Sequence, residues 1–240
     1  MRLALALLFI LAATTATIVT ASNPATASEA AGLAKRVIAA YGGARTIEQG
    51  GSFKQSGTLE SYRHGKTGTV ERRFTRPGRL RIEIRIPGEP PESRILDGEK
   101  GWRDGKPVPP MMAKAMYLQA ARLDLPWLIM QAGQNLQMLG PVKHDDGRDL
   151  EALEIPMAEG IRLIAVVDPE TGHIVRSHGL IILAPGQEVE FGTLYEGHGD
   201  LNGMILDTEE THFARGQPTG KTTLESSEVV EGFPDGVFRP

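Results

Sequence analysis

The sequence predicts a mainly β protein built on one continuous, curved antiparallel sheet of about ten strands, with one helical insertion. Three observations lead to this expectation. Apolar and polar residues alternate in several segments, most clearly in residues 79–86, where Leu80, Ile82 and Ile84 are separated by charged residues. Gly and Pro stand between these segments, where hairpin turns need them. One long apolar segment in the middle of the chain has helical spacing instead.

Residues 1–27 have the organisation of a secretory signal peptide. Arg2 gives a short positive region, residues 3–13 form an apolar run, and Ala25-Thr26-Ala27 matches the cleavage pattern of small residues. The alternative is an uncleaved membrane anchor, but the apolar run is shorter than the ~20 residues that a spanning helix needs. We therefore expect a periplasmic protein cleaved near Ala27. Residues 28–240 are expected to form one domain, because no long linker divides them.

A helix is expected directly after the leader, and a meander of strands after that helix. In residues 29–41 apolar side chains recur at helical spacing, and Gly42-Gly43 ends the pattern. The strands expected next are residues 52–62, 68–76, 79–86 and 93–96. Their close spacing and polar turns indicate antiparallel pairing.

The middle of the chain interrupts the strands. Residues 110–131 combine methionines, alanines and Trp127 at helical spacing, and Pro126 is expected to break this helix into two pieces. A second meander follows, with strands expected at residues 150–155, 161–168, 173–183, 188–195, 203–213 and 222–230. Joining the two meanders in one covered sheet would leave few free strand edges.

Charge and composition exclude several functions. The formal net charge is −4 and no dense Lys/Arg block is present, so nucleic acid is not an expected partner. The absence of cysteine excludes disulfides, thiol nucleophiles and thiolate zinc sites. Residues 60–103 carry eleven basic and seven acidic residues. This Arg-rich face is either simply solvated, or it docks an acidic partner or a lipid headgroup through Arg72, Arg73 and Arg81.

The sequence contains no signature of catalysis. It has no HExxH metalloprotease motif, no Gly-x-Ser-x-Gly nucleophile elbow and no phosphate-binding Gly-rich loop. We therefore expect neither enzyme activity nor a cofactor. Two alternatives rest on histidines. One is a hydrolase with a His/Asp site at the rim, which would use His198 or His212, and the other is a metal site formed by Glu210, His212 and His198.

Four local patterns follow one another over most of the chain. The first is Tyr41-Gly42-Gly43-Ala44, followed by Gly57-Thr58-Leu59 in a strand. The second is the hairpin Ile95-Leu96-Asp97-Gly98-Glu99-Lys100-Gly101-Trp102, and the third is Val167-Asp168-Pro169-Glu170-Thr171-Gly172. The fourth runs from Tyr195 through Asn202-Gly203-Met204 to the ending Phe233-Pro234-Asp235-Gly236-Val237-Phe238. In this order, and behind a signal peptide, the patterns resemble the superfamily of the outer-membrane lipoprotein carriers LolA and LolB.

The resemblance implies an unclosed antiparallel β-barrel, a mainly β (α+β) half-barrel in which a helical lid covers an apolar cavity. It also implies a non-catalytic periplasmic carrier or sensor of lipid or lipoprotein acyl chains, with a membrane-bound envelope protein as a further candidate partner. A partner-binding regulatory module remains an alternative. Methionine suits such a lid because its flexible thioether adapts to variable chains. The residues expected to line the cavity are Leu80, Ile82, Ile84, Trp102, Met112, Met116, Leu123, Trp127 and Leu128.

Overall fold

The computed structural model describes residues 24–144, 146–201 and 203–240. The strands of the first meander are β1 (Ser52–Ser61), β2 (Lys66–Thr75), β3 (Arg79–Arg85), β4 (Glu92–Asp97), β5 (Lys100–Arg103) and β6 (Lys106–Pro107). Those of the second are β7 (Gln137–Lys143), β8 (Asp149–Ile155), β9 (Ile161–Val167), β10 (Ile174–Ala184), β11 (Gln187–Leu201), β12 (Met204–Ala214) and β13 (Gln217–Val229).

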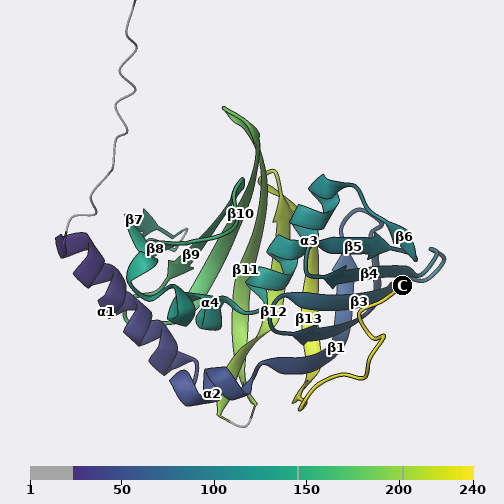
Figure 1. Cartoon of the computed structure of the whole chain (residues 1–240), viewed down its shortest axis with the longest axis horizontal. Helices are drawn as coiled ribbons and strands as arrows, with labels where there is room; N and C mark the ends of the chain where they lie inside the picture. The colour runs from purple at the N-terminus through teal and green to yellow at the C-terminus, as the bar shows by residue number, and fades with distance from the viewer. Residues whose placement is uncertain (1–23, 145, 202) are drawn as a thin grey trace, which may run out of the picture.

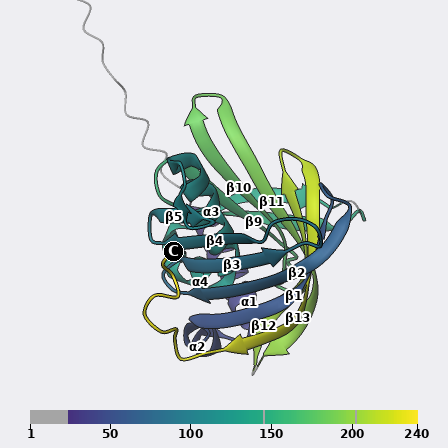
Figure 2. The same cartoon turned by 90° about the vertical axis from the view of Figure 1, so that its right-hand side faces the viewer.

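All of these strands belong to one antiparallel sheet, in the order β6-β5-β4-β3-β2-β1-β13-β12-β11-β10-β9-β8-β7. The pairing of β1 with β13 joins the two meanders, with Phe53 opposite Val229. Figure 2 shows the strands on either side of this junction lying next to one another. Because β6 and β7 end the sheet without pairing to each other, the barrel is open. The prediction of an unclosed half-barrel is confirmed.

Three strands, β5, β6 and β7, lie outside the predicted strand ranges, although β5 overlaps the predicted hairpin at residues 95–102. β5 and β6 have only four and two residues, too few for an alternating pattern to be recognised. β7 contains Gly140 and Pro141, two residues that ordinarily argue against a strand. Its register shifts between Met138 and Gly140, and it ends the sheet, where an irregular strand is tolerated.

The helices are α1 (Pro24–Ala40), α2 (Ala44–Gln49), α3 (Pro110–Arg122) and α4 (Leu125–Ala132), with a 3₁₀ turn, η1, at Gly133–Asn135. The predicted division of the central helix is confirmed, and Pro126 lies in the first turn of α4, where its missing N–H costs nothing. Of the predicted signal peptide, residues 1–23 lie outside the described residues, and residues 24–27 begin α1. None of the described helices is long and apolar enough to cross a membrane.

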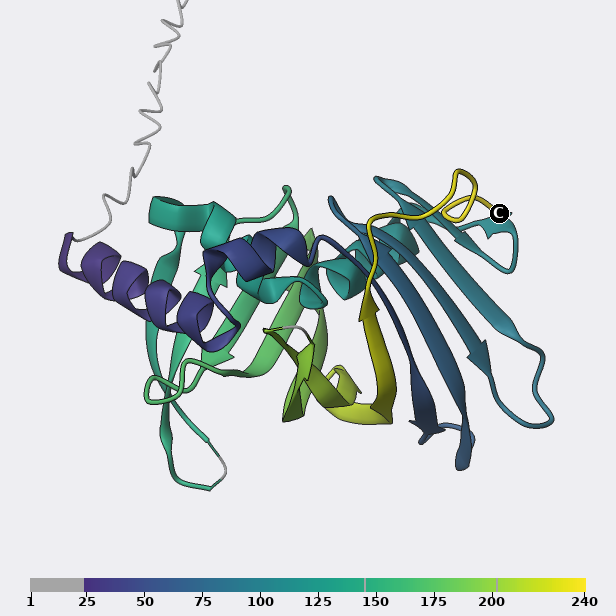
Figure 3. The same cartoon turned by 90° about the horizontal axis from the view of Figure 1, so that it is seen from below.

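The helices lie along one face of the curved sheet, the concave face (Figures 1 and 3). α3 contacts β4 and β5 at one side of the trough and β10 at the other. α1 packs against α4 and β7, and α2 packs against α4. The helices therefore cover the inside of the half-barrel, as a lid would.

Two apolar clusters fill the space between helices and sheet. The larger lies in the second meander, under α1 and α4, and includes Leu33, Val37, Ile129, Leu153 and Leu163. The smaller lies in the first meander, under α3, and consists of Phe53, Val70, Phe74, Leu80, Ile82, Leu96, Met116 and Ala120. Near the centre of the sheet, β2, β12 and β13 place buried polar groups between these clusters.

Candidate ligand-binding cavity

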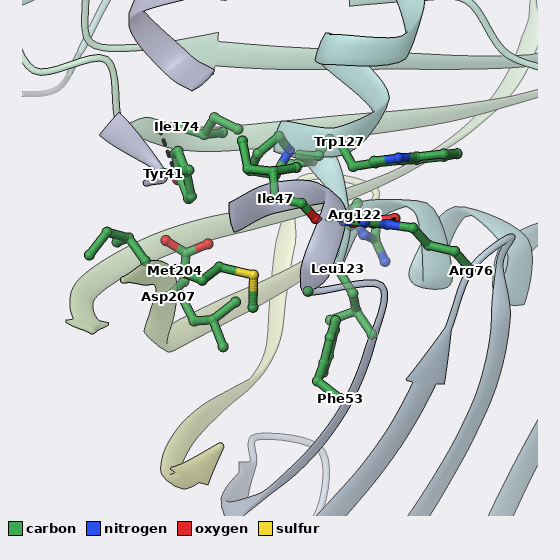
Figure 4. Close-up of a pocket in the computed structure, with 16 residues that line it drawn as sticks. Tyr41, Ile47, Phe53, Arg76, Arg122, Leu123, Trp127, Ile174, Met204 and Asp207 are labelled. Atoms are coloured by element: carbon green, nitrogen blue, oxygen red, sulfur yellow. Dashed lines mark hydrogen bonds and ion pairs between the residues drawn. The ribbon is translucent and has the colours of Figure 1, made fainter. Parts of the chain in front are cut away.

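An apolar cavity lies where α2 and the start of α4 face β1, β10 and β12 (Figure 4). Its volume, measured as the space open to the centre of a water molecule, is about 40 Å³. One water needs roughly 10–15 Å³ on this measure, so the cavity has room for a few waters and not for an acyl chain. Its apolar lining consists of Tyr41, Ile47, Phe53, Leu123, Leu125, Pro126, Trp127, Ile174, Met204, Ile205 and Leu206.

Arg76, directly after β2, ties the sheet to both helices over this cavity. Its Nε and Nη2 donate to the two carboxylate oxygens of Asp124, the residue before α4, at 2.7 and 2.6 Å. Its Nη1 donates to the backbone carbonyl of Ile47 in α2 at 2.6 Å. The guanidinium also lies 4.9 Å from the ring centroid of Trp127. We call Arg76 and Asp124 the latch, because one pair of side chains holds α2, α4 and β2 together.

Burial makes the carboxylate of the latch costly to ionise. It raises the pKa of Asp124 to about 6, although the hydrogen bonds and charge of Arg76 act in the opposite direction. Asp124 is only 6% exposed, which agrees with this direction. Near pH 6 a proton therefore competes with Arg76 for the same oxygens.

The opposite wall of the cavity contains Asp207 of β12. Its Oδ1 lies 3.1 Å from Nδ1 of His198, and the His198 ring lies 4.0 Å, centroid to centroid, from the ring of His173. Burial raises the pKa of Asp207 to about 6, against the effect of His198. Tyr41 accepts a hydrogen bond from the backbone N–H of Ile174 at 3.2 Å. These contacts give each histidine and carboxylate a structural partner.

A second, smaller cavity lies beside the first and is polar. A bidentate ion pair crosses it, in which Nη1 and Nη2 of Arg72 each donate to one carboxylate oxygen of Glu210 at 2.7 Å. Both residues are buried. The charge of Arg72 holds the pKa of Glu210 below its ordinary value, even though burial alone would raise it. The lining is Arg72, Gln119, Arg122, Leu123, Thr193, Tyr195, Glu210 and His212.

The Arg72–Glu210 pair also reports the curvature of the sheet. β2 and β12 are separated by β1 and β13, which amounts to roughly 14 Å along the sheet at ~4.8 Å per strand. Their side chains meet because both point into the trough and the trough is tightly curved. His212 lies next to this pair, with Nε2 2.9 Å from Thr222 Oγ1 and 3.6 Å from Glu210. Burial lowers the pKa of His212 to about 4, so its ring is neutral at pH 7.

Two of the nine predicted cavity residues, Leu123 and Trp127, line the apolar cavity. Leu80, Ile82 and Met116 face the concave side as expected, but they are buried inside the smaller apolar cluster and do not line the cavity. Ile84 packs against this cluster and Leu128 against the larger one. These residues belong to the packed core.

Trp102 and Met112 are not placed where they were expected. A Cβ at Gly101 would lie 2.8 Å from Val108 and 3.2 Å from Met116, so Gly101 faces α3. Successive strand residues point to opposite faces, and Trp102 therefore lies on the outer face. Met112, in the first turn of α3, is 37% exposed. Met112 was expected from the apolar spacing of the central helix and Trp102 from the hairpin at residues 95–102, and neither pattern determines the side on which the residue lies.

The predicted docking arginines also divide between the two faces. Arg72 is buried in the ion pair with Glu210, so its assignment to an exposed docking face is wrong. It could not share a face with its neighbour Arg73, because side chains alternate along a strand. Arg73 pairs with Glu71 at 3.1 Å. Arg81 pairs with Glu83 at 2.7 Å and donates to the carbonyl of Val237 at 3.1 Å, so the C-terminal segment covers part of this outer face.

The sequence suggested a metal site formed by Glu210, His212 and His198. In residues 24–144, 146–201 and 203–240, no three His, Asp or Glu side chains are grouped so that they could hold a metal ion. His198 pairs with Asp207, whereas His212 pairs with Thr222 and Glu210. Sequence reasoning overlooked Arg76, Asp124 and Arg122. Two features of the sequence could have indicated these residues. Arg76 is a basic residue at the end of a predicted strand, and Arg122 and Asp124 are charged residues within a mainly apolar helical segment.

Comparison with known proteins supports this architecture. The sequence matches no protein-family model and no curated protein. Its structure is similar to that of a LolA superfamily protein from Nitrosomonas europaea, with a TM-score of 0.52 and 13% identity over 82% of this chain and 97% of that one. The chain has a LolA-like fold. An outer-membrane lipoprotein-sorting protein domain from Vibrio parahaemolyticus is a further match, with a TM-score of 0.48 and 11% identity over 88% of this chain and 97% of that one.

The two cavities can be located within this LolA-like fold. In this chain the open sheet forms the trough, α3 and α4 lie across it, and the apolar cavity opens under α2 and α4. The cavity is therefore on the concave side of a LolA-like half-barrel, where the resemblance found in the sequence predicted a ligand site.

Proposed function

We propose that this chain is a non-catalytic periplasmic carrier or sensor whose ligand has an acyl chain, bound under α2 and α4. The observation that carries the proposal is an apolar cavity closed by helices that a single latch holds to the sheet. We further propose that the chain is cleaved near Ala27 and that residues 28–240 act as one domain.

The small volume of the closed cavity requires the lid to move. α4 has only eight residues, and a helix of this length has little stability of its own. When the latch opens, Trp127 and the apolar face of α4 separate from the sheet. An acyl chain inserted there would bury apolar surface worth roughly 25 cal/mol per Å², before the costs of ordering the chain are subtracted. The ligand thus replaces contacts that the closed lid makes with the sheet.

The test is to purify the protein from a periplasmic extract without detergent, and to combine native mass spectrometry with organic extraction of bound molecules. Wild type is expected to carry species with acyl chains, whereas Trp127→Glu should lose them because a carboxylate would enter the cavity. Leu183→Glu is the matched control, since Leu183 is 48% exposed and does not line the cavity.

Circular dichroism must show that both variants are folded. If wild type is free of lipid and also fails to bind a fluorescent fatty acid saturably, the carrier proposal is wrong.

A further inference from the structure

Arg122, the last residue of α3, is a half-buried cation whose guanidinium has no partner among the described residues. Its Nη1 is inaccessible to solvent and makes no hydrogen bond. No ion pair or side-chain hydrogen bond of Arg122 is found in the part of the chain that the structure describes. Buried polar groups are nearly always hydrogen-bonded, so the exception at Arg122 raises the question of which group could pair with it. Gln55 Oε1 and Arg176 Nε are the other buried side-chain atoms without a hydrogen bond in the described residues, but neither residue lines a cavity.

The charges around Arg122 identify the missing group. In the polar cavity the charges of Arg72 and Glu210 neutralise each other, and His212 is neutral because burial lowers its pKa to about 4. Tyr195 is also neutral, since burial raises its pKa above the ordinary range. Burial lowers the pKa of Arg122 as well, but a guanidinium remains protonated at pH 7. The cavity therefore holds one positive charge in excess, in a setting where an unpaired charge is unfavourable.

The position of Arg122 links this charge to the apolar cavity. Arg122 and Leu123 line both cavities, and Figure 4 shows Arg122 close to Leu123, Ile47 and Trp127. A ligand in the apolar cavity therefore has the cation of Arg122 beside it. Arg76, the other guanidinium of the apolar cavity, is already paired with Asp124. Of the three arginines that line the two cavities, Arg122 is the one whose guanidinium makes no hydrogen bond or ion pair within the residues that the structure describes.

We propose that Arg122 binds the carboxylate of a single-chain amphiphile, whose hydrocarbon chain lies in the apolar cavity. This inference rests on the proposed function and specifies its ligand class. The polar cavity is open to water centres over about 20 Å³, room for one or two waters, which fits a carboxylate better than a phosphodiester. A bidentate carboxylate would also satisfy the fork of a guanidinium.

The test compares dodecanoate with dodecanol, which have the same chain length and differ in the head group. Affinities are measured at pH 7.5 by displacement of the neutral probe N-phenyl-1-naphthylamine. A hydrogen bond to a charged group contributes about 1.5–3 kcal/mol, so wild type should bind dodecanoate at least roughly tenfold more tightly than dodecanol. Arg122→Met should remove this preference and leave dodecanol affinity within about threefold of wild type. Arg63→Met is the control, because it removes the same charge from an exposed residue.

The possible outcomes distinguish the proposed role of Arg122 from the proposed carrier function. Equal affinity of wild type for acid and alcohol, or an unchanged preference in Arg122→Met, overturns the role of Arg122 and leaves the carrier function in place. Failure of wild type to bind either compound overturns the carrier function itself. If Arg122→Met does not fold, Arg122→Gln is used, and the wild-type comparison decides independently of any variant.

Discussion

At the scale of single residues, the buried pair of Arg72 and Glu210 determines how the two halves of the sheet face each other. Removing two charges from water is costly, and the cost is offset only when geometry is good and the remaining donors and acceptors are satisfied. Two hydrogen bonds of 2.7 Å meet the first condition. The pair therefore acts more as a constraint on curvature than as a source of stability.

We predict that Glu210→Gln lowers the free energy of unfolding by about 3–5 kcal/mol, because it leaves Arg72 buried without a counter-charge. Glu209→Gln, one residue away on the other face, should cost less than about 1 kcal/mol, since its ion pair with Lys221 is exposed. Urea denaturation measures both variants. Equal effects of the two substitutions would show that the buried pair has no special role.

At the scale of elements, α2 and α4 are the parts of the lid that depend most on a single side chain. Both are short, with six and eight residues, and Arg76 contacts both of them. α3 is longer and contacts the sheet on both sides of the trough. The two short helices therefore depend on Arg76 for their polar contacts with the sheet, whereas α3 packs against strands on both sides of the trough.

We predict that Arg76→Leu opens α2 and α4 locally without unfolding the sheet. The loss of charge-assisted hydrogen bonds of about 1.5–3 kcal/mol should speed amide hydrogen exchange in α2 and α4 by roughly 10- to 100-fold. Exchange in β8, β9 and β10 should not change. Arg85→Leu is the control, because its side chain is 61% exposed and its ion pair with Glu71 is long, at 3.9 Å. Unchanged protection of α4 in Arg76→Leu would mean that the latch does not hold the lid.

The elements themselves were largely predictable from the sequence. The alternation of Leu80, Ile82 and Ile84 with charged residues reflects a sheet with one covered face, and the structure confirms it. Period two also places Arg72 on the same face as Val70 and Phe74, which should have excluded Arg72 from the outer face. Its partner Glu210 is 138 residues away in sequence, and local patterns carry no information about such a pairing. The latch was missed for the same reason.

At the scale of the whole molecule, the half-barrel contains two apolar cores with a polar region between them. α3 reaches both cores, whereas the apolar cavity opens at their boundary, beside the buried charges. A cavity with an apolar part and a neighbouring cation suits a ligand that has a chain and a charged head. We therefore expect an acyl chain to enter under α2 and α4, on the concave face.

The most direct measurement is photo-crosslinking with a hexadecanoate that carries a diazirine in its chain, followed by peptide mapping of the labelled sites. We expect labels to concentrate at residues 123–127 and 204–207, and excess unlabelled hexadecanoate to abolish them. Labels spread over the outer face, or labels that unlabelled hexadecanoate does not compete away, would contradict this expectation.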